Sequence, residues 1–229
     1  MEPPLEIPVM TLANVILFPQ AMLPLYIFEP RYRRMLDDVL HSHRMFALAL
    51  KKPGRTREVP SQVAGLGLIR AAVTNKDGTS HLILQGLTRV ELTATVRSKP
   101  YRIHRIRPLA TTGHDSVVVD ALTAKVLDLV EERFEQCFYL PVHLLKQLDK
   151  ISESLGKALP GEVSLKHVLR YLTKLDNPDY LADLVSCTLL PGADQRQTIL
   201  EAVHLETRLK HLIHFLIAEI RRTKNDQDS

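Results

Sequence analysis

The sequence predicts an α+β fold, with a small β-barrel that carries one helix over residues 1–113 and an α-helical bundle over residues 114–229. Three observations support this prediction. In the first half, apolar residues form short runs separated by Gly, Pro, Asn and Asp, which is typical of strands joined by turns. In the second half, apolar residues recur at the spacing of one helix face. Between the halves, residues 111–115 have the small polar composition of a linker.

Two apolar runs near the start, residues 15–18 and 23–28, are expected to be buried strands because they are short, rich in branched and aromatic residues and bounded by Pro. Pro24 lacks the N–H that a strand ladder uses, so it has to lie at a strand end, an edge or a bulge. Beyond the second run the apolar spacing becomes helical, and Pro30 suits a first helical turn. A strand is therefore expected to lead directly into a short amphipathic helix over residues 29–43.

The remaining strands of the first half are expected at residues 45–50, 63–73, 81–92 and 95–109. Gly65 and Gly67 predict a bulge or a tight corner in the second of these strands. Asp77 and Gly78 predict a hairpin turn, because this pair adopts the positive-φ conformations that a tight turn requires. Short strands joined by hairpins, with a single helix, favour a small barrel that is closed or nearly closed.

Helices of the second half are expected at residues 117–134, 142–155, 165–172, 180–190, 195–200 and 205–220, with a frayed polar tail after residue 220. Asn177 is expected to cap the fourth helix, and Pro178 to occupy its first position. Cys137 and Cys187 both fall within helical patterns, so we expect two buried free thiols, with a disulfide between them as an alternative that nothing in the sequence supports.

Charge separates the two halves further. Residues 1–115 hold sixteen Lys and Arg against nine Asp and Glu, a net charge of +7, whereas residues 116–229 hold fourteen against seventeen, a net charge of −3. This asymmetry favours two domains with different surfaces. No apolar run reaches the roughly 20 residues of a membrane-spanning helix, and the first residues lack the pattern of a secretory signal. We therefore expect a cytoplasmic protein that does not bind membranes.

Several short segments follow one another along the chain in a recognisable order. In the first half these are Ile7-Pro8-Val9, the run ending in Phe18-Pro19, Pro24-Leu25-Tyr26, and Phe28-Glu29-Pro30-Arg31-Tyr32. In the second half they are Asn177-Pro178, Leu181-Ala182-Asp183 and Arg208-Leu209. In this order they resemble the N-terminal substrate-binding domain of the ATP-dependent protease Lon, and the segment from Phe28 to Tyr32 looks most like the stand-alone bacterial versions of that domain. The resemblance covers residues 7–222 and implies a PUA-like barrel followed by a helical bundle.

The resemblance also implies a protein that recruits polypeptide, and the motifs of the other Lon activities are missing. The sequence has no Gly-x-x-x-x-Gly-Lys-Ser/Thr loop for ATP, and the Ser-Lys pair of the Lon peptidase belongs to a domain that is not expected here. We therefore expect a non-enzymatic module without cofactor or metal, although the family name can carry a peptidase label. Its expected partners are unfolded or specific protein segments, with a protease or ATPase acting in trans as a further candidate. The sequence gives no prediction of oligomeric state.

The candidate polypeptide-binding residues are Met22, Tyr26, Arg31 and Arg34, which carry over from the first strand–helix junction of the Lon family. Methionine adapts to varied apolar partners, and the two arginines would form a basic rim. Phe28 lies at the same junction, but we expect it to belong to the barrel core, and burial in the core is also the alternative for Tyr26.

Two other functions remain open. Arg102, Arg105 and Arg107 lie along the last predicted strand near Tyr101, and cations beside an aromatic ring can hold phosphates and stack bases, as in RNA-binding PUA-like modules. The competing explanation is a barrel edge kept basic to prevent aggregation. Nucleic acid is the less favoured partner because the net charge of the chain is only +4. The second alternative is an uncharacterised enzyme, which would need a deep pocket with convergent polar groups.

Histidine and cysteine supply further candidates for chemistry. His211 and His214 are three residues apart on the last predicted helix, so both can reach one metal ion, but a solvated helix face is the favoured interpretation. His41 and His43 flank a helix end, where a cation is favourable. Cys137 as a nucleophile is less favoured than Cys137 as a buried structural residue.

Overall fold

The computed structural model describes residues 3–54, 58–113, 117–136 and 171–227 of the 229-residue chain. The chain divides into two compact units, Met1–Ala110 and Thr111–Ser229, and each is described by itself. The predicted helix at residues 142–155, most of the one at 165–172, and Cys137 lie outside the described residues. Among the helices that are described, none is long and apolar enough to cross a membrane.

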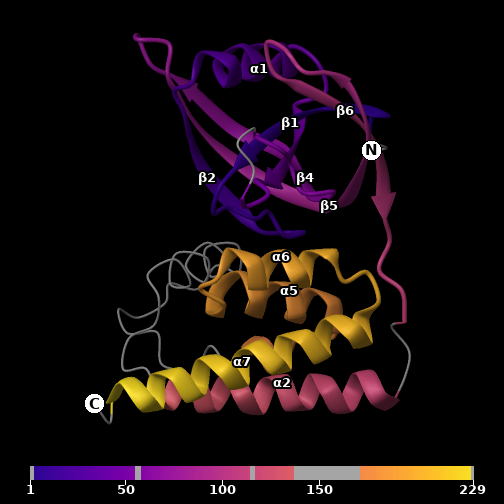
Figure 1. The fold of residues 1–229 in the computed structure, drawn as a ribbon, viewed down its shortest axis with the longest axis vertical. Helices are drawn as coiled ribbons and strands as arrows, with labels where there is room; N and C mark the ends of the chain where they lie inside the picture. The colour runs from indigo at the N-terminus through magenta and orange to yellow at the C-terminus, as the bar shows by residue number, and fades with distance from the viewer. Residues whose placement is uncertain (1–2, 55–57, 114–116, 137–170, 228–229) are drawn as a thin grey trace. The chain divides into compact units, whose positions relative to one another are not determined.

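The first unit is a mixed sheet of six strands with one helix (Figure 1). Its elements are β1 (Glu6–Leu12), β2 (Met22–Ile27), α1 (Pro30–Leu40), β3 (Met45–Leu50), β4 (Val63–Thr74), β5 (Ser80–Arg97) and β6 (Arg102–Leu109). The strand order is β2-β5-β4-β3-β1-β6, and β6 also pairs with β5, so the pairings from β5 through β4, β3, β1 and β6 close into a ring. Only β1 and β3 are parallel among these pairs. Together with the helical second unit, this sheet confirms the predicted α+β class.

The long strand β5 has two neighbours along one edge. Its residues 80–85 pair with β2 and its residues 89–97 pair with β6, while β4 follows its other edge. β2 therefore ends the strand order, and the prediction that Pro24 lies at an edge is confirmed. The predicted strand over 95–109 is wrong as a single element, because β5 ends at Arg97 and β6 begins at Arg102. β6 pairs with β1 and β5 on its two sides, so its basic residues do not protect a free edge.

Residues 16–18 are buried as predicted and Val15 is half-buried, but residues 15–18 form a loop and not a strand. Leu17 and Phe18 are fully buried and pack where glycines leave room for their main chain. A Cβ on Gly65 would lie 2.0 Å from the Leu17 carbonyl oxygen, and a Cβ on Gly86 would lie 1.9 Å from that of Phe18. The predicted irregularity near Gly67 is also present, as a register shift between β4 and β5. This close approach of backbone explains why the strands hold glycine at these positions.

The helix α1 begins at Pro30, as predicted, and its buried face carries Tyr32, Met35, Leu36 and Val39. The Tyr32 hydroxyl accepts a hydrogen bond from the Thr11 N–H at 3.1 Å and donates one to the Thr11 carbonyl at 3.2 Å. The Tyr101 hydroxyl donates to Asp38 Oδ2 at 2.6 Å. These bonds fasten α1 to β1 on one side and to the turn between β5 and β6 on the other.

The described part of the second unit consists mainly of the helices α2 (Val117–Gln136), α5 (Pro178–Leu189), α6 (Ala193–Glu201) and α7 (Leu205–Gln227), of which α2 and α7 lie side by side (Figure 1). The predicted cap of α5 is confirmed, because the Asn177 side chain accepts hydrogen bonds from the N–H groups of Asp179 at 2.9 Å and Tyr180 at 3.2 Å. The predicted apolar stripe of α7 is buried at Leu205, Leu209, Leu212, Leu216 and Ile220. α7 continues to Gln227, so the prediction of a frayed tail after residue 220 is wrong.

A buried arginine joins several segments of the second unit. Arg208 of α7 has no exposed surface, and its Nε donates to the Ala202 carbonyl at 2.8 Å. Its Nη2 donates to the Thr111 hydroxyl at 3.2 Å. Its Nη1 contacts Asp179 and lies 3.6 Å from Asp183 Oδ1. The segments of the second half that carry the resemblance to Lon therefore meet in the core of this unit.

Candidate functional site

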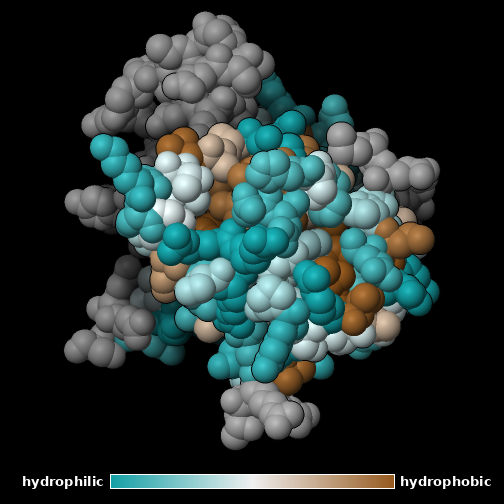
Figure 2. Space-filling model, turned by 90° about the horizontal axis from the view of Figure 1, so that it is seen from above, coloured by the Kyte–Doolittle hydropathy of each residue, from teal (hydrophilic) through white to brown (hydrophobic). Residues whose placement is uncertain are grey.

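Polar residues cover most of the face shown in Figure 2, and apolar residues reach the surface there in separate small groups. Exposed apolar side chains that adjoin one another therefore mark a candidate binding surface. Two exposed aromatic residues stand out, Tyr26 with 49% and Phe28 with 59% of their surface exposed. Tyr26 lies within β2 and Phe28 directly follows it, and both flank the buried Ile27, so their side chains lie on the outer side of the sheet. The prediction that Phe28 belongs to the core is therefore wrong.

The outer face of β2 continues across β5 and β4. In the strand register Tyr26 lies opposite His81, which lies opposite Val73. In the next row Pro24 lies opposite Ile83, which lies opposite Ala71. We call these six residues, together with Phe28, the outer patch.

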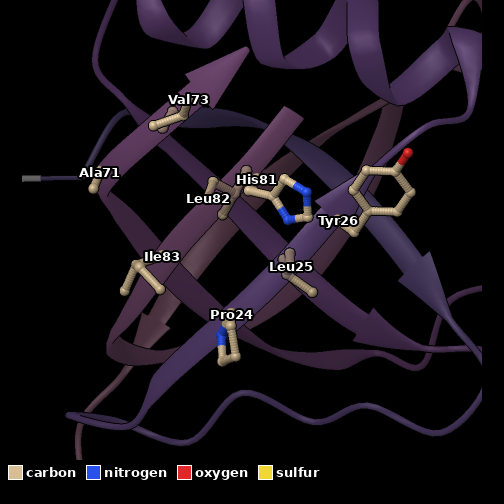
Figure 3. A pocket seen from close by; sticks show the side chains of 9 residues that line it. Pro24, Leu25, Tyr26, Ala71, Val73, His81, Leu82 and Ile83 are labelled. Atoms are coloured by element: carbon tan, nitrogen blue, oxygen red, sulfur yellow. The ribbon is translucent and has the colours of Figure 1, made fainter. Parts of the chain in front are cut away.

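Aromatic rings form one end of the outer patch. The Tyr26 ring stacks on the Phe28 ring with 5.8 Å between centroids, and it lies 4.8 Å from the His81 ring. Figure 3 shows the Tyr26 and His81 side chains next to each other above the strands. Because the neighbouring Val73 is 65% exposed, this apolar surface is open to a partner.

A hollow of about 430 Å³ lies within the outer patch (Figure 3). It is lined by Pro24, Leu25, Tyr26, Ala71, Ala72, Val73, His81, Leu82 and Ile83. The Tyr26 hydroxyl and the His81 imidazole are its only polar side-chain groups. A hollow of this composition can accept apolar side chains, but it does not offer the set of convergent polar groups that chemistry on a bound substrate would need.

The structure places the four predicted binding residues in two groups. Met22 and Tyr26 both lie at positions of β2 whose side chains face outward, and Met22 is half-buried. Arg31 and Arg34 lie on α1 and do not line the hollow. The sequence analysis did not find the part of the outer patch on β4 and β5, which includes His81. Apolar residues occur at both odd and even positions of these strands, and this was a signal that both faces of the sheet make apolar contacts.

The guanidinium group of Arg31 is held by acids of its own chain. It forms a bidentate ion pair with Glu58, in which Nη1 and Nη2 donate to the two carboxylate oxygens at 3.0 and 2.8 Å. Its Nε donates a further hydrogen bond to Glu29 Oε2 at 2.8 Å. The hydrogen bonds to Glu58 raise the pKa of Arg31, so the group is charged and fixed in place. Arg34 is more exposed and lies 3.3 Å from Asp38, one helical turn along α1.

The three arginines of the RNA-binding alternative are also paired. Arg105 lies 3.4 Å from Glu6, and Arg107 donates to Glu91 at 2.9 Å through Nε. Arg102 donates to the Glu58 carbonyl and lies 3.8 Å from its carboxylate. Glu58 therefore serves both Arg31 and Arg102, two residues that sequence reasoning assigned to different functions.

The remaining titratable candidates lie apart from the outer patch. His41 Nδ1 is 2.8 Å from the Asp37 carbonyl at the end of α1, and burial lowers the pKa of His43. His211 and His214 both lie against Phe215, and within the described ranges no three His, Cys, Asp or Glu side chains gather as a metal site would require. Burial raises the pKa of Cys187 to about 12, which keeps the thiol protonated.

Comparison with known proteins agrees with the sequence and with this fold. The model of the ATP-dependent protease La (LON) substrate-binding domain matches residues 6–218. The chain belongs to this family. The Lon proteases of Desulfosudis oleivorans and Citrifermentans bemidjiense are 24% and 27% identical to it over 212 and 219 residues. These alignments cover 90% and 94% of this chain but 23% and 24% of the relatives, so the chain spans about a quarter of their length.

Solved structures with the same fold include Lon N-terminal domains. That of the Mycobacterium avium complex Lon protease has a TM-score of 0.64 and 18% identity, covering 92% of this chain and 97% of that one. The Lon N-terminal domain protein of Xanthomonas campestris has a TM-score of 0.61 and 19% identity, covering 92% and 98%. The predicted membership of the Lon substrate-binding domain family is thus confirmed.

Proposed function

We propose that this Lon-family chain binds segments of polypeptide on the outer patch and performs no catalytic chemistry of its own. The observation that carries the proposal is the adjoining exposure of Tyr26, Phe28, His81 and Val73 beside an apolar hollow. Unfolded chains differ from folded ones by exposing apolar side chains, and an exposed apolar surface attracts these without requiring one sequence. We also infer that the closed ring of strands is the small PUA-like barrel that the resemblance implied.

Lon relatives are named as proteases, and this chain matches about a quarter of their length. We infer that a segment held on the outer patch would be handed to a protease or ATPase acting in trans. RNA binding has less support, because Arg102, Arg105 and Arg107 each lie beside a glutamate of the same unit. Phosphates would have to displace these carboxylates before the arginines could hold RNA.

The test is the binding of fluorescein-labelled casein, an unfolded protein, measured by fluorescence anisotropy. The doubly substituted variant Tyr26→Ser, Phe28→Ser removes two exposed rings and is expected to bind about tenfold more weakly, as expected for aromatic anchors of an interface. Its fold should persist, because both side chains are largely exposed.

The matched control is Val96→Ser, since Val96 is 47% exposed on β5 but lies outside the outer patch. This variant should bind casein as the unchanged chain does. Equal binding by all three proteins would overturn the proposal, as would cleavage of casein by the purified chain alone.

A further inference from the structure

Among the described residues, no strand lies along one edge of the β2 main chain. β2 ends the strand order, and within the described ranges it pairs only with β5. Just before its start the Gly86 N–H donates to the Ala21 carbonyl at 2.9 Å, and the Gly86 carbonyl accepts from the Gln20 N–H at 2.8 Å, so the Ala21 carbonyl faces β5 as in a hydrogen-bonded pair of the antiparallel ladder. Such pairs recur at every second residue. Leu23, Leu25 and Ile27 therefore direct their main-chain groups toward β5.

The intervening residues Met22, Pro24 and Tyr26 direct their main-chain groups away from β5. Proline at the middle of these positions agrees with this assignment, because a proline in a strand is tolerated where its missing N–H would face away from the sheet. The free edge thus offers the carbonyls of all three residues and the N–H groups of Met22 and Tyr26. The side chains of Pro24 and Tyr26 belong to the outer patch, so the edge and the patch adjoin each other.

We propose that the bound polypeptide is an extended segment with acidic flanks, which pairs with the free edge of β2 as an additional strand. This inference rests on the proposed function and names the form and charge of what is bound. Main-chain hydrogen bonds are the same for every sequence, which suits a module that takes many unfolded chains. Alternate side chains of the added strand fall on the outer face, beside Tyr26 and Phe28.

Charge decides between the possible occupants of this edge. Residues 1–110 hold sixteen Lys and Arg against eight Asp and Glu, a net charge of +8. Five of these acids already face cations of the same unit, in the pairs Glu6–Arg105, Glu29–Arg31, Asp38–Arg34, Glu58–Arg102 and Glu91–Arg107. A second copy of this unit would bring the same positive charge and be repelled, whereas a strand with acidic flanks is attracted.

The probe is a fluorescein-labelled dodecapeptide with Val, Phe and Tyr at alternate central positions and two Glu residues at each end. Two isomers carry backbone N-methyl groups, one at the odd and one at the even central positions, so that each isomer loses the N–H groups along one edge. We expect one isomer to bind more than tenfold more weakly than the parent and the other within about twofold, because only one edge faces β2. Equal binding by the parent and both isomers would overturn strand pairing.

A variant of the protein that should bind the dodecapeptide more tightly provides a second test. Pro24→Ala adds an N–H to the free edge and is expected to tighten binding of the parent dodecapeptide about fivefold, as one added main-chain hydrogen bond would. The control Pro108→Ala changes an exposed proline of β6 outside the outer patch and should leave binding unchanged. Dimerisation of Pro24→Ala in sedimentation without tighter peptide binding would instead make a second copy the occupant and overturn the proposal.

Two further comparisons test the preference for acidic flanks and distinguish a failure of strand pairing from a failure of the proposed function. A dodecapeptide with Lys in place of each Glu is expected to bind at least fivefold more weakly at low ionic strength, with the difference shrinking as salt is added. Equal binding of the two would overturn the acidic preference. If labelled casein binds and no dodecapeptide does, strand pairing is wrong and the proposed function stands; if neither binds, both are wrong.

Discussion

Arg208 of α7 and Asp183 of α5 face each other in the core of the helical unit, with 3.6 Å between Nη1 and Oδ1 and almost no exposed surface on either side chain. Both residues belong to the segments that resemble Lon, and the contact gives that resemblance a physical reason. A buried charge is tolerated only when it is paired and hydrogen-bonded. Arg208 meets this condition through Asp179, Asp183, Ala202 and Thr111 together.

Removal of the guanidinium group should therefore be strongly destabilising. Arg208→Ala is expected to lower the free energy of unfolding of the helical unit by about 3–5 kcal/mol, because Asp183 stays buried without its cation. Urea unfolding followed by circular dichroism measures the change. Lys210→Ala removes an exposed ion pair with Glu206, which lies four residues earlier on α7, and should leave the unfolding curve unchanged. A similar curve for both variants would contradict a structural role of Arg208.

The glycines that admit residues 15–18 supply a second test. Gly65→Ala would place a methyl group 2.0 Å from the Leu17 carbonyl oxygen, which is main chain and cannot rotate away. We expect a loss of about 3 kcal/mol in unfolding free energy, at the upper end for overpacked sites. Gly54→Ala is the control, since nothing lies within 4 Å of the added Cβ and only the positive φ of 68° is unfavourable. A smaller loss for Gly65→Ala than for Gly54→Ala would contradict this packing.

These glycines also show which features of the fold the sequence predicts and which it does not. The composition of residues 15–18 correctly predicted burial for all but the half-buried Val15, but a short apolar run has the same periodicity in a buried loop as in a buried strand. What decides between them is the space left by Gly65 and Gly86, which lie far along the chain. Local signals with local causes, such as Pro30 at the start of α1 and Asn177 at the start of α5, were predicted correctly.

The outer patch was only half predictable for a related reason. Tyr26 was proposed from its position at the strand–helix junction, but Phe28, at the same junction, was assigned to the barrel core. The register that brings His81 and Val73 beside Tyr26 depends on strand pairing, which a single sequence does not reveal. Pairing of β5 with both β2 and β6 was hidden in the same way.

The bond between α1 and β1 should depend on a single hydroxyl group. Tyr32→Phe leaves the ring in place but removes the acceptor of the Thr11 N–H and the donor to its carbonyl. Because Tyr32 and Thr11 are both buried, water does not readily replace these bonds, and we expect a loss of about 1–3 kcal/mol in unfolding free energy. Tyr26→Phe, which removes a hydroxyl from an exposed ring, is the control and should change stability by less than about 0.5 kcal/mol. Chemical denaturation of the two variants gives the comparison.

Acid should destabilise the first unit through His104. Burial, and then the charge of Arg102, lower the pKa of this imidazole below its usual 6.5, and neither ring nitrogen has a hydrogen-bond partner. As pH falls through 6.5 the unfolded chain takes up a proton that the folded chain does not, so the unfolding free energy decreases until the lowered folded-state pKa is passed. The slope for one such group is at most about 1.4 kcal/mol per pH unit.

His104→Leu removes this group and should flatten the dependence of stability on pH between 7 and 5, as measured by urea unfolding at each pH. The pKa of His43 is lowered by burial as well, so part of the dependence will remain in the variant. An identical pH dependence before and after the substitution would show that His104 does not contribute.

The paired state of the β6 arginines leads to a prediction about nucleic acid. A site for RNA needs cations that are free to meet phosphates, whereas Arg105 and Arg107 already face Glu6 and Glu91 across the strands. Single-stranded RNA should therefore bind no more tightly than the roughly 10⁻⁴–10⁻⁶ M of non-specific complexes. In gel-shift titrations the triple variant Arg102→Gln, Arg105→Gln, Arg107→Gln should behave like the unchanged chain. Submicromolar, salt-sensitive RNA binding that disappears in this variant would make β6, and not the outer patch, the functional surface of the first unit.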